Sequence, residues 1–470
     1  MSGPEPTSPR GAITMVLTDP DGVITALCPN CEALTGRSAT EVIGSPLALL
    51  LHPEQPTGLA SWLTGELAAG SMATSYQHLA NRHGGSIWQM SLACAWPGGA
   101  LHLGFAPRLE DRQLQAQRMY RTATEAERRA LEAGLSRDAA TNIGTQSLQE
   151  NLSQEGFGDY GDLVFSALPT EVSSRPEPAK QLDGPLAPVW ALALRLHHLL
   201  REAREKYDKL YETSQVMVSG AKAVQDQVEP VNQAADQAVE FAAEREGAAA
   251  TLMTAAHRLR AAAGDGTVKL RTLANGVLRA HGLIIGQRRA LAGLAILSHA
   301  VLDTLRQATA LDALSDEAAL PTPARGQRPY LDPSFYEALA ASLSVQMQSL
   351  AMETARTQAA LTRLTKEAIE AAGQLRLFAS ALTSWRLLAS RFELDAWLLP
   401  SDLDFDTTAS QIDGLRDLAR DTSSRVGVLD AAAIAEAAAA VGRALRGYLP
   451  RPPALPEPAP PPPPTKPAWL

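Results

Sequence analysis

Cysteine, aromatic residues, positive charge and long apolar runs are all scarce in this chain. Only three of its 470 residues are cysteine (Cys28, Cys31 and Cys94), which excludes a disulfide-stabilised scaffold and suits a reducing compartment. Aromatic residues make up 5% of the chain and apolar residues 45%, so the apolar share is mostly aliphatic, as in closely packed helices. The 42 lysines and arginines are outnumbered by 51 acidic residues, which argues against nucleic-acid binding through a basic surface.

Apolar runs long enough to cross a membrane are also missing. The nearest approach, residues 282–302, carries Arg288 and Arg289 and falls short of the ~18 uncharged residues that a membrane helix needs. The opening residues MSGPEPTSPRG lack the basic-then-apolar order of a secretory signal. We therefore expect a cytoplasmic protein with no membrane span.

The pattern along the chain predicts an α+β domain followed by a long all-α region. Short strands are expected at 13–18, 23–27, 75–80, 86–95 and 100–105, and short helices at 31–34, 38–43 and 59–69. The predicted organisation is a disordered tail at 1–11, the α+β domain at 12–107, a helical linker at 108–155, a loop at 156–188, a coiled coil or helical bundle at 189–448, and a proline-rich disordered tail at 449–470.

Heptad repeats dominate two of the long helical tracts, predicted at 189–264 and 333–399. Steps of four and three residues place apolar side chains on one seam from Leu196 to Ala242, and on a second seam from Leu343 to Leu399. Such seams indicate supercoiling against partner helices. A bundle within one chain and a homodimeric coiled coil both satisfy them, and we expect the homodimer. Pro230 is expected to kink or break the first tract.

The N-terminal region resembles the PAS family of sensory domains. The resemblance rests on the segments 18–27 (TDPDGVITAL), 34–36 (LTG), 41–44 (EVIG) and 84–88 (GGSIW). The segment 51–56 (LHPEQP) is similar to a motif of Aer-type aerotaxis receptors, and the interval from it to Trp88, which includes 81–85 (NRHGG), keeps the length found in that family. The resemblance implies a strand–turn–strand start, short helices, and a ligand-facing sheet that contains Trp88.

Aer-type domains bind FAD, so the resemblance also implies candidate cofactor residues. His52 and Glu54 keep the histidine and acidic positions of the family motif, and Trp88 lies on the ligand-facing sheet. The family's early asparagine falls on Cys28, and its flavin-contacting arginine and tryptophan are also replaced. FAD is therefore the candidate cofactor, with an empty pocket or another ligand as the alternatives.

Residues 333–447 resemble the signalling hairpin of methyl-accepting chemotaxis receptors. The segment 387–396 (LLASRFELDA) is similar to the run near the hairpin tip, and 405–423 to the returning helix, with a turn expected at 399–402. At the centre of the tip, Arg391 and Phe392 depart from the family pattern. The resemblance implies a chemotaxis kinase and its coupling protein as partners.

Other reactive groups have weaker patterns. Cys28 and Cys31 form a C-x-x-C pair that could cycle between dithiol and disulfide or could simply fill the domain interior. The sequence shows no zinc-binding arrangement, so no metal ligands are predicted. His52, His78 and His83 are the candidates for a haem ligand, although a lone histidine is more often a hydrogen-bonding group.

The sequence therefore predicts a signal-transduction protein. In this hypothesis the PAS domain senses redox state or a small ligand and passes a conformational change to the helical bundle. The alternative is a helical scaffold in which a ligand-free PAS domain serves for docking. No nucleophilic triad, phosphate-binding loop or kinase ATP-binding motif is present, so an enzyme is not expected.

Overall fold

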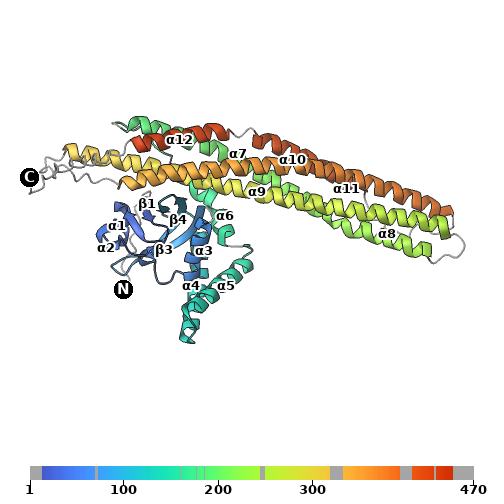
Figure 1. Cartoon of the computed structure of the whole chain (residues 1–470), viewed down its shortest axis with the longest axis horizontal. Coiled ribbons are helices and arrows are strands. Elements are labelled where there is room, and N and C mark those ends of the chain that lie inside the picture. The colour runs from blue at the N-terminus through green and yellow to red at the C-terminus, as the bar shows by residue number, and fades with distance from the viewer. Residues whose placement is uncertain are drawn as a thin grey trace, which may run out of the picture.

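The chain forms a small α+β domain and a long helical bundle, which lie against each other (Figure 1). The computed structural model describes residues 13–68, 72–158, 160–175, 177–184, 186–243, 249–317, 332–391, 405–427 and 430–447. The two predicted terminal tails lie outside these residues. Among the described helices, none contains a stretch apolar enough to cross a membrane.

A five-stranded antiparallel sheet forms the centre of the N-terminal domain, with strand order β2-β1-β5-β4-β3. The strands are β1 (Thr14–Thr18), β2 (Ile24–Leu27), β3 (Met72–Ala80), β4 (Ser86–Trp96) and β5 (Gly99–Phe105). All five were predicted, with ends within three residues. Asp19 shapes the first turn, because its Oδ1 accepts the amides of Asp21 and Val23, and Gly22 follows with a φ of 78° that favours glycine.

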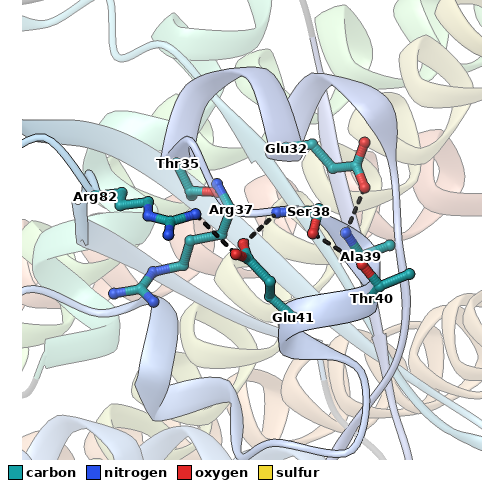
Figure 2. A network of polar contacts seen from close by, with 8 residues as sticks. All are labelled: Glu32, Thr35, Arg37, Ser38, Ala39, Thr40, Glu41 and Arg82. Carbon is teal, nitrogen blue, oxygen red and sulfur yellow. Dashed lines mark hydrogen bonds and ion pairs between the residues drawn. The ribbon is translucent and has the colours of Figure 1, made fainter.

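Short helices connect β2 to β3. They are α1 (Pro29–Thr35), α2 (Ala39–Val42), the 3-10 turn η1 (Leu47–Leu50) and α3 (Thr57–Ala68). Figure 2 shows how α2 begins: the Glu41 carboxylate accepts the Ser38 amide at 3.0 Å and pairs with Arg82 of the β3–β4 hairpin at 2.8 Å. The bond from the Ser38 amide, with Arg82 beside it, lowers the pKa of Glu41. These contacts hold the short helices against the hairpin.

Three helices link the domain to the bundle: α4 (Glu110–Glu132), α5 (Arg137–Gln154) and α6 (Tyr160–Ser173). The linker was predicted as one helix that frays near residue 142. It is two helices, because Gly134 adopts a φ of 83° and Ser136 caps α5 by accepting the Ala139 amide. The predicted loop at 156–188 contains α6, whose apolar side is buried even though Pro169 lies inside the helix.

Two buried carboxylates accept hydrogen bonds from the first backbone amides of α3 and α4. Glu127 of α4 accepts the amide and hydroxyl of Thr57 at the start of α3, and Gly144 of α5 leaves it room. Glu171 of α6 accepts the amides of Arg108 and Leu109 at the start of α4, at 2.8 and 2.9 Å. Each negative charge lies where the helix dipole is positive.

The bundle runs up, down, up and down within one chain. Its helices are α7 (Ala187–Asp226), α8 (Val228–Ala243), α9 (Ala249–Glu317), α10 (Pro333–Arg391), α11 (Phe405–Gly427) and α12 (Ala431–Gly447). In Figure 1, α8 continues the direction of α7, α9 returns along them, α10 runs beside α9, and α11 and α12 return along α10. This is the up-and-down arrangement of a four-helix bundle.

The first predicted tract, 189–264, does not exist as one unit. The chain leaves α8 at Ala243 and enters α9 at Ala249, and α9 continues through Gly264, where the first tract was predicted to end, and through Gly266. The break expected from Pro230 is confirmed, since α7 ends at Asp226, the residue whose carbonyl the proline ring would contact.

Both heptad seams are buried inside this single chain. Every position of the first seam from Leu196 to Ala242 is buried, and so is the second seam from Leu343 to Ala389, except for the half-buried Thr354. The predicted periodicity is therefore confirmed. Because the seams pack within one chain, they no longer supply a reason for the homodimer, which stays a prediction.

A separate apolar cluster lies at the end of the bundle remote from the sheet. It is built by α8, α9 and α10, and Phe378 and Trp385 are its largest side chains. The main core is a different cluster, continuous from the sheet through α6 and along the bundle as far as Leu270 of α9, Leu375 of α10 and Ile412 of α11. The bundle therefore has two packing units along its length.

The two faces of the sheet differ in polarity. On one face, Met15 and Leu92 belong to the main core, and α9 crosses them: Thr304 contacts the sulfur of Met15, and Gly293 lies against Met72. The other face carries a row of buried polar groups in which Thr14 donates to Gln89 and Gln89 donates to Gln77.

The lack of a side chain at Gly104 permits this polar row. Gly104 of β5 lies between β1 and β4, and any side chain there would collide with the bonded oxygens of Thr14 and Gln89. One face of the sheet therefore packs on α9, with α10 also in contact with β4 and β5, and the other face carries the bonded row of Thr14, Gln89 and Gln77.

His102, on the polar face, makes stability depend on pH. Its Nε2 lies 3.2 Å from the Thr18 hydroxyl, and burial lowers its pKa to about 4. The ordinary histidine pKa is about 6.5, so between these values the unfolded chain binds more protons than the folded one. The free energy of unfolding is therefore full above about pH 6.5 and falls as the pH falls towards 4.

We expect His102→Gln to reduce this dependence. Between about pH 7.5 and pH 5 the wild type should lose about 2 kcal/mol more than the variant, from the difference in the two pKa values. Urea unfolding of both proteins at the two pH values measures the difference. Parallel losses would show that His102 titrates alike in the folded and unfolded chains.

Candidate functional site

The outer edge of β3 is closed by side chains. The Tyr76 amide donates to the Tyr160 hydroxyl at 3.0 Å, and the Tyr76 carbonyl accepts the Tyr120 hydroxyl at 2.6 Å. The two hydroxyls also bond to each other, so Tyr160 donates to Tyr120, whose own proton is used on the carbonyl. Further along, the His78 amide donates to Gln55 at 2.8 Å. The edge is thus tied to α4 and α6 and offers no free strand edge there.

Beside this edge, two histidines, a glutamate and a tryptophan gather. The His52 amide donates to the His78 carbonyl at 2.7 Å, and the two imidazole centroids are 4.1 Å apart. His78 in turn lies directly opposite Trp88 in the β3–β4 register, and their rings stack at 4.4 Å with 11° between planes. Nitrogen and oxygen ligand atoms of His52, Glu54 and His78 all lie within 4.8 Å of one another.

His78 is the least solvated member of this group. Its residue is 3% exposed, and neither ring nitrogen has a hydrogen-bond partner. Burial, with His52 nearby, lowers the pKa of His78 to about 4, so its ring is neutral at pH 7. Glu54 is exposed, and its amide donates to His52 Nδ1 at 3.3 Å. The group therefore runs from a buried imidazole to an exposed carboxylate.

The structure brings together three of the four predicted cofactor residues, His52, Glu54 and Trp88. Cys28 lies apart, because it follows β2 at one edge of the sheet and His78 lies in β3 at the other. The Cys28 sulfur accepts the Met15 amide at 3.0 Å. His83, in the β3–β4 hairpin, is exposed.

The C-x-x-C pair is buried rather than reactive. Cys28 and Cys31 are each 1% exposed, and burial raises the pKa of both thiols. Cys28 directly precedes α1, and a helix start favours a thiolate, but desolvation of the buried sulfur outweighs this effect. The structure therefore favours the interpretation of these cysteines as interior packing.

Flavin, the cofactor implied by the resemblance, fits these residues poorly as they are arranged. The ring of Trp88 is already stacked on His78 and lies 5.7 Å from Tyr120. The principal cavities among the described residues are lined by none of the four predicted cofactor residues. A flavin would have to displace His78 from Trp88 to reach this ring.

A second polar region lies where the sheet, the 177–184 segment, α7 and α9 meet. Two adjoining cavities of about 190 and 170 Å³ share Arg175, Glu177 and His299. Arg175 lies 3.9 Å over the Phe105 ring, and burial lowers its pKa to about 10. Burial also lowers the pKa of His299 to about 3. Acidic and basic groups both line the cavities, so their charge selects no class of ligand.

Sequence reasoning missed the residues that connect the site to the bundle. Tyr120 lies in the predicted linker and Tyr160 in the predicted loop, and no local pattern marks either. An apolar run over 160–168 was the one available signal that α6 packs on the sheet. At the other end, α11 begins at Phe405, where the receptor resemblance places the returning helix, while the predicted turn at 399–402 and Phe392 lie outside the described residues.

Comparisons with known proteins do not assign a role to this site. Neither a scan of protein-family models nor a search of curated proteins finds a match to this chain.

Proposed function

We propose that this chain is a signal-transduction protein whose N-terminal PAS-type domain senses a small ligand or redox state and relays the change through its helical bundle. A single observation carries the proposal: the sheet packs directly on α9, a helix of 69 residues that also reaches the remote end of the bundle. At about 1.5 Å per residue, α9 is about 100 Å long. A cytoplasmic location, FAD as one possible ligand, and chemotaxis-type kinase and coupling proteins as partners belong to the same proposal.

Two contacts connect α9 to the sensing domain directly, and a third connects it to α6. The Ile13 amide donates to Asp303 at 3.3 Å, Thr304 contacts Met15, and Arg289 bonds Asp162 of α6. Because α6 also carries Tyr160, a change at the β3 edge has a continuous packed route to α9. The strand–turn–strand start and the Trp88 strand support the PAS interpretation, as does the strand order 2-1-5-4-3.

The alternative is a helical scaffold with a docking domain. One observation favours it: the sheet and most of the length of the bundle share one continuous apolar core, which suits a rigid joint. The two functions differ in whether a change in the sheet alters the bundle.

Hydrogen exchange in a Tyr160→Phe variant separates the two. The substitution removes the acceptor of the Tyr76 amide and one Tyr–Tyr bond, a change of about 1–2 kcal/mol at the sheet edge. For a sensor we expect amides of α9 near Arg289, and of its remote half, to exchange at least about fivefold faster. Glu41→Gln, which removes the charge paired with Arg82 at the surface of the same domain and keeps a side-chain oxygen to accept the Ser38 amide, is the matched control.

Faster hydrogen exchange confined to β3, α4 and α6 would contradict the relay and favour the scaffold.

An absorbance spectrum of the purified chain from about 300 to 600 nm tests the flavin part of the proposal separately. A flavin band would show that His78 leaves its place on Trp88, and a blank spectrum would remove FAD from the proposal while leaving the relay untouched.

A further inference from the structure

We propose that His52, Glu54 and His78 bind one divalent transition-metal ion of the Zn²⁺ class. Two imidazoles and one carboxylate form a donor set that suits zinc, copper, nickel or ferrous iron, whereas calcium and magnesium prefer all-oxygen sites. The binding site stands on its own geometry, and only its use as the input of a sensor rests on the function proposed above.

The three ligands come from two places in the fold. His78 is held in β3 by its backbone bonds to Gln55 and His52 and by stacking on Trp88. His52 and Glu54 lie in the segment between η1 and α3, where Glu54 is exposed. One ligand is therefore fixed, and the other two lie on a surface segment that can adjust.

The distances require a small closure. The ligand atoms lie within 4.8 Å of one another. In a tetrahedral site with metal–nitrogen bonds of about 2.0–2.1 Å, ligand atoms are about 3.3 Å apart. Movement of the His52 and Glu54 side chains by about 1 Å supplies the difference, and water completes the coordination at the exposed side.

The unpartnered ring of His78 points independently to a ligand. Both ring nitrogens of His78 are buried without a hydrogen-bond partner, which is unfavourable for an imidazole removed from water. The flat contact with Trp88 fixes the plane of the ring. A metal on one nitrogen would give this side chain the partner that the fold leaves out.

Metal binding would also remove a hydrogen bond from the segment between η1 and α3. His52 Nδ1 now accepts the Glu54 amide at 3.3 Å. If Nδ1 binds the metal, this acceptor is lost, and if Nε2 binds, Nδ1 carries the proton and can no longer accept. The Glu54 amide is therefore released whichever nitrogen of His52 is used.

Isothermal titration calorimetry of the chelator-treated full-length protein with Zn²⁺ tests the site. We expect one equivalent to bind with a Kd in the micromolar range or below, and Co²⁺ to give the intense visible bands of a four-coordinate site. His52→Ala and Glu54→Gln, both outside the buried core, should each weaken binding at least about tenfold, and His78→Gln more strongly. His83→Ala, an exposed histidine on the neighbouring hairpin, is the matched control and should bind as the wild type does.

Hydrogen exchange with and without Zn²⁺ adds the structural readout, in which the Glu54 amide should exchange faster in the metal-bound protein. Absence of binding at about 100 µM Zn²⁺, or binding unaffected by His52→Ala and Glu54→Gln, would overturn the site. Binding lost in Cys28→Ser but kept in His52→Ala would overturn it in favour of the cysteine pair.

The same experiment keeps the two proposals apart. Binding without altered exchange in α9 leaves the metal site standing and contradicts its use as a sensor input. No binding, together with altered α9 exchange in Tyr160→Phe, removes the metal site and supports the relay.

Discussion

Glu171→Ala is expected to lower the free energy of unfolding by about 3 kcal/mol. The carboxylate is fully buried and accepts the amides of Arg108 and Leu109, and no other side chain caps α4 there. Alanine leaves both amides without an acceptor, and each such loss costs about 1–3 kcal/mol. It also removes the acidic neighbour of the half-buried Arg175. Urea unfolding followed by circular dichroism measures the change.

Two companion variants identify the cause. Glu171→Gln keeps one carbonyl acceptor and should lose about half as much. Glu110→Ala removes an exposed acidic residue from the first turn of the same helix and should change stability by less than about 0.5 kcal/mol. Equal losses in Glu171→Ala and Glu110→Ala would mean that charge near the helix start, rather than direct capping, stabilises α4.

Phe378→Ala is expected to destabilise the remote end of the bundle by about 3–5 kcal/mol. Its side chain is fully buried in the cluster formed by α8, α9 and α10, and truncation removes apolar contacts and leaves a cavity. Because this cluster is separate from the main core, the loss should be local. Hydrogen exchange should accelerate in α8 and in residues 249–263 while the sheet keeps its protection.

Leu377 provides the control from the adjacent position. Its side chain is 59% exposed, and Leu377→Ala should stay within about 0.5 kcal/mol of the wild type. If Phe378→Ala instead accelerates exchange in the sheet as much as in α8, the whole chain unfolds as one unit and the two clusters are energetically one.

Local chemistry explains why the strands could be predicted from the sequence. The turns between them contain glycines at positive φ, including Gly22, Gly84 and Gly99, and such turns depend on a few adjacent residues. The heptad seams were predictable for a similar reason, because burial on one side of a helix repeats every three or four residues.

The predictions that were wrong concern features set by contacts between residues far apart in the sequence. Gly264 and Gly266 look like a helix boundary, yet α9 passes through them, because packing over many turns outweighs about 1 kcal/mol per glycine. Helix α6 was taken as a loop, because Pro169 and flanking glycines hide a short apolar run. Its position is set by tertiary contacts with the sheet and α9.

The candidate site divides in the same way. His52 and Glu54 were recognisable as a motif, and Trp88 as part of a strand. The role of His78 needed the register that places it opposite Trp88, and register is settled by pairing across strands. Tyr120 and Tyr160 close the β3 edge from helices far away in the sequence, which no local pattern could foretell.

The length of α9 has a mechanical consequence. The Ile13–Asp303 hydrogen bond marks the point where α9 is held against the domain. Leu252 in the remote cluster lies 51 residues away along the same helix. At about 1.5 Å per residue this lever arm is about 75 Å, so a tilt of about two degrees at the sheet displaces its far end by about 2.5 Å. Movements of α9 that are too small to disturb its packing at the sheet thus displace its remote end by about half a helical turn.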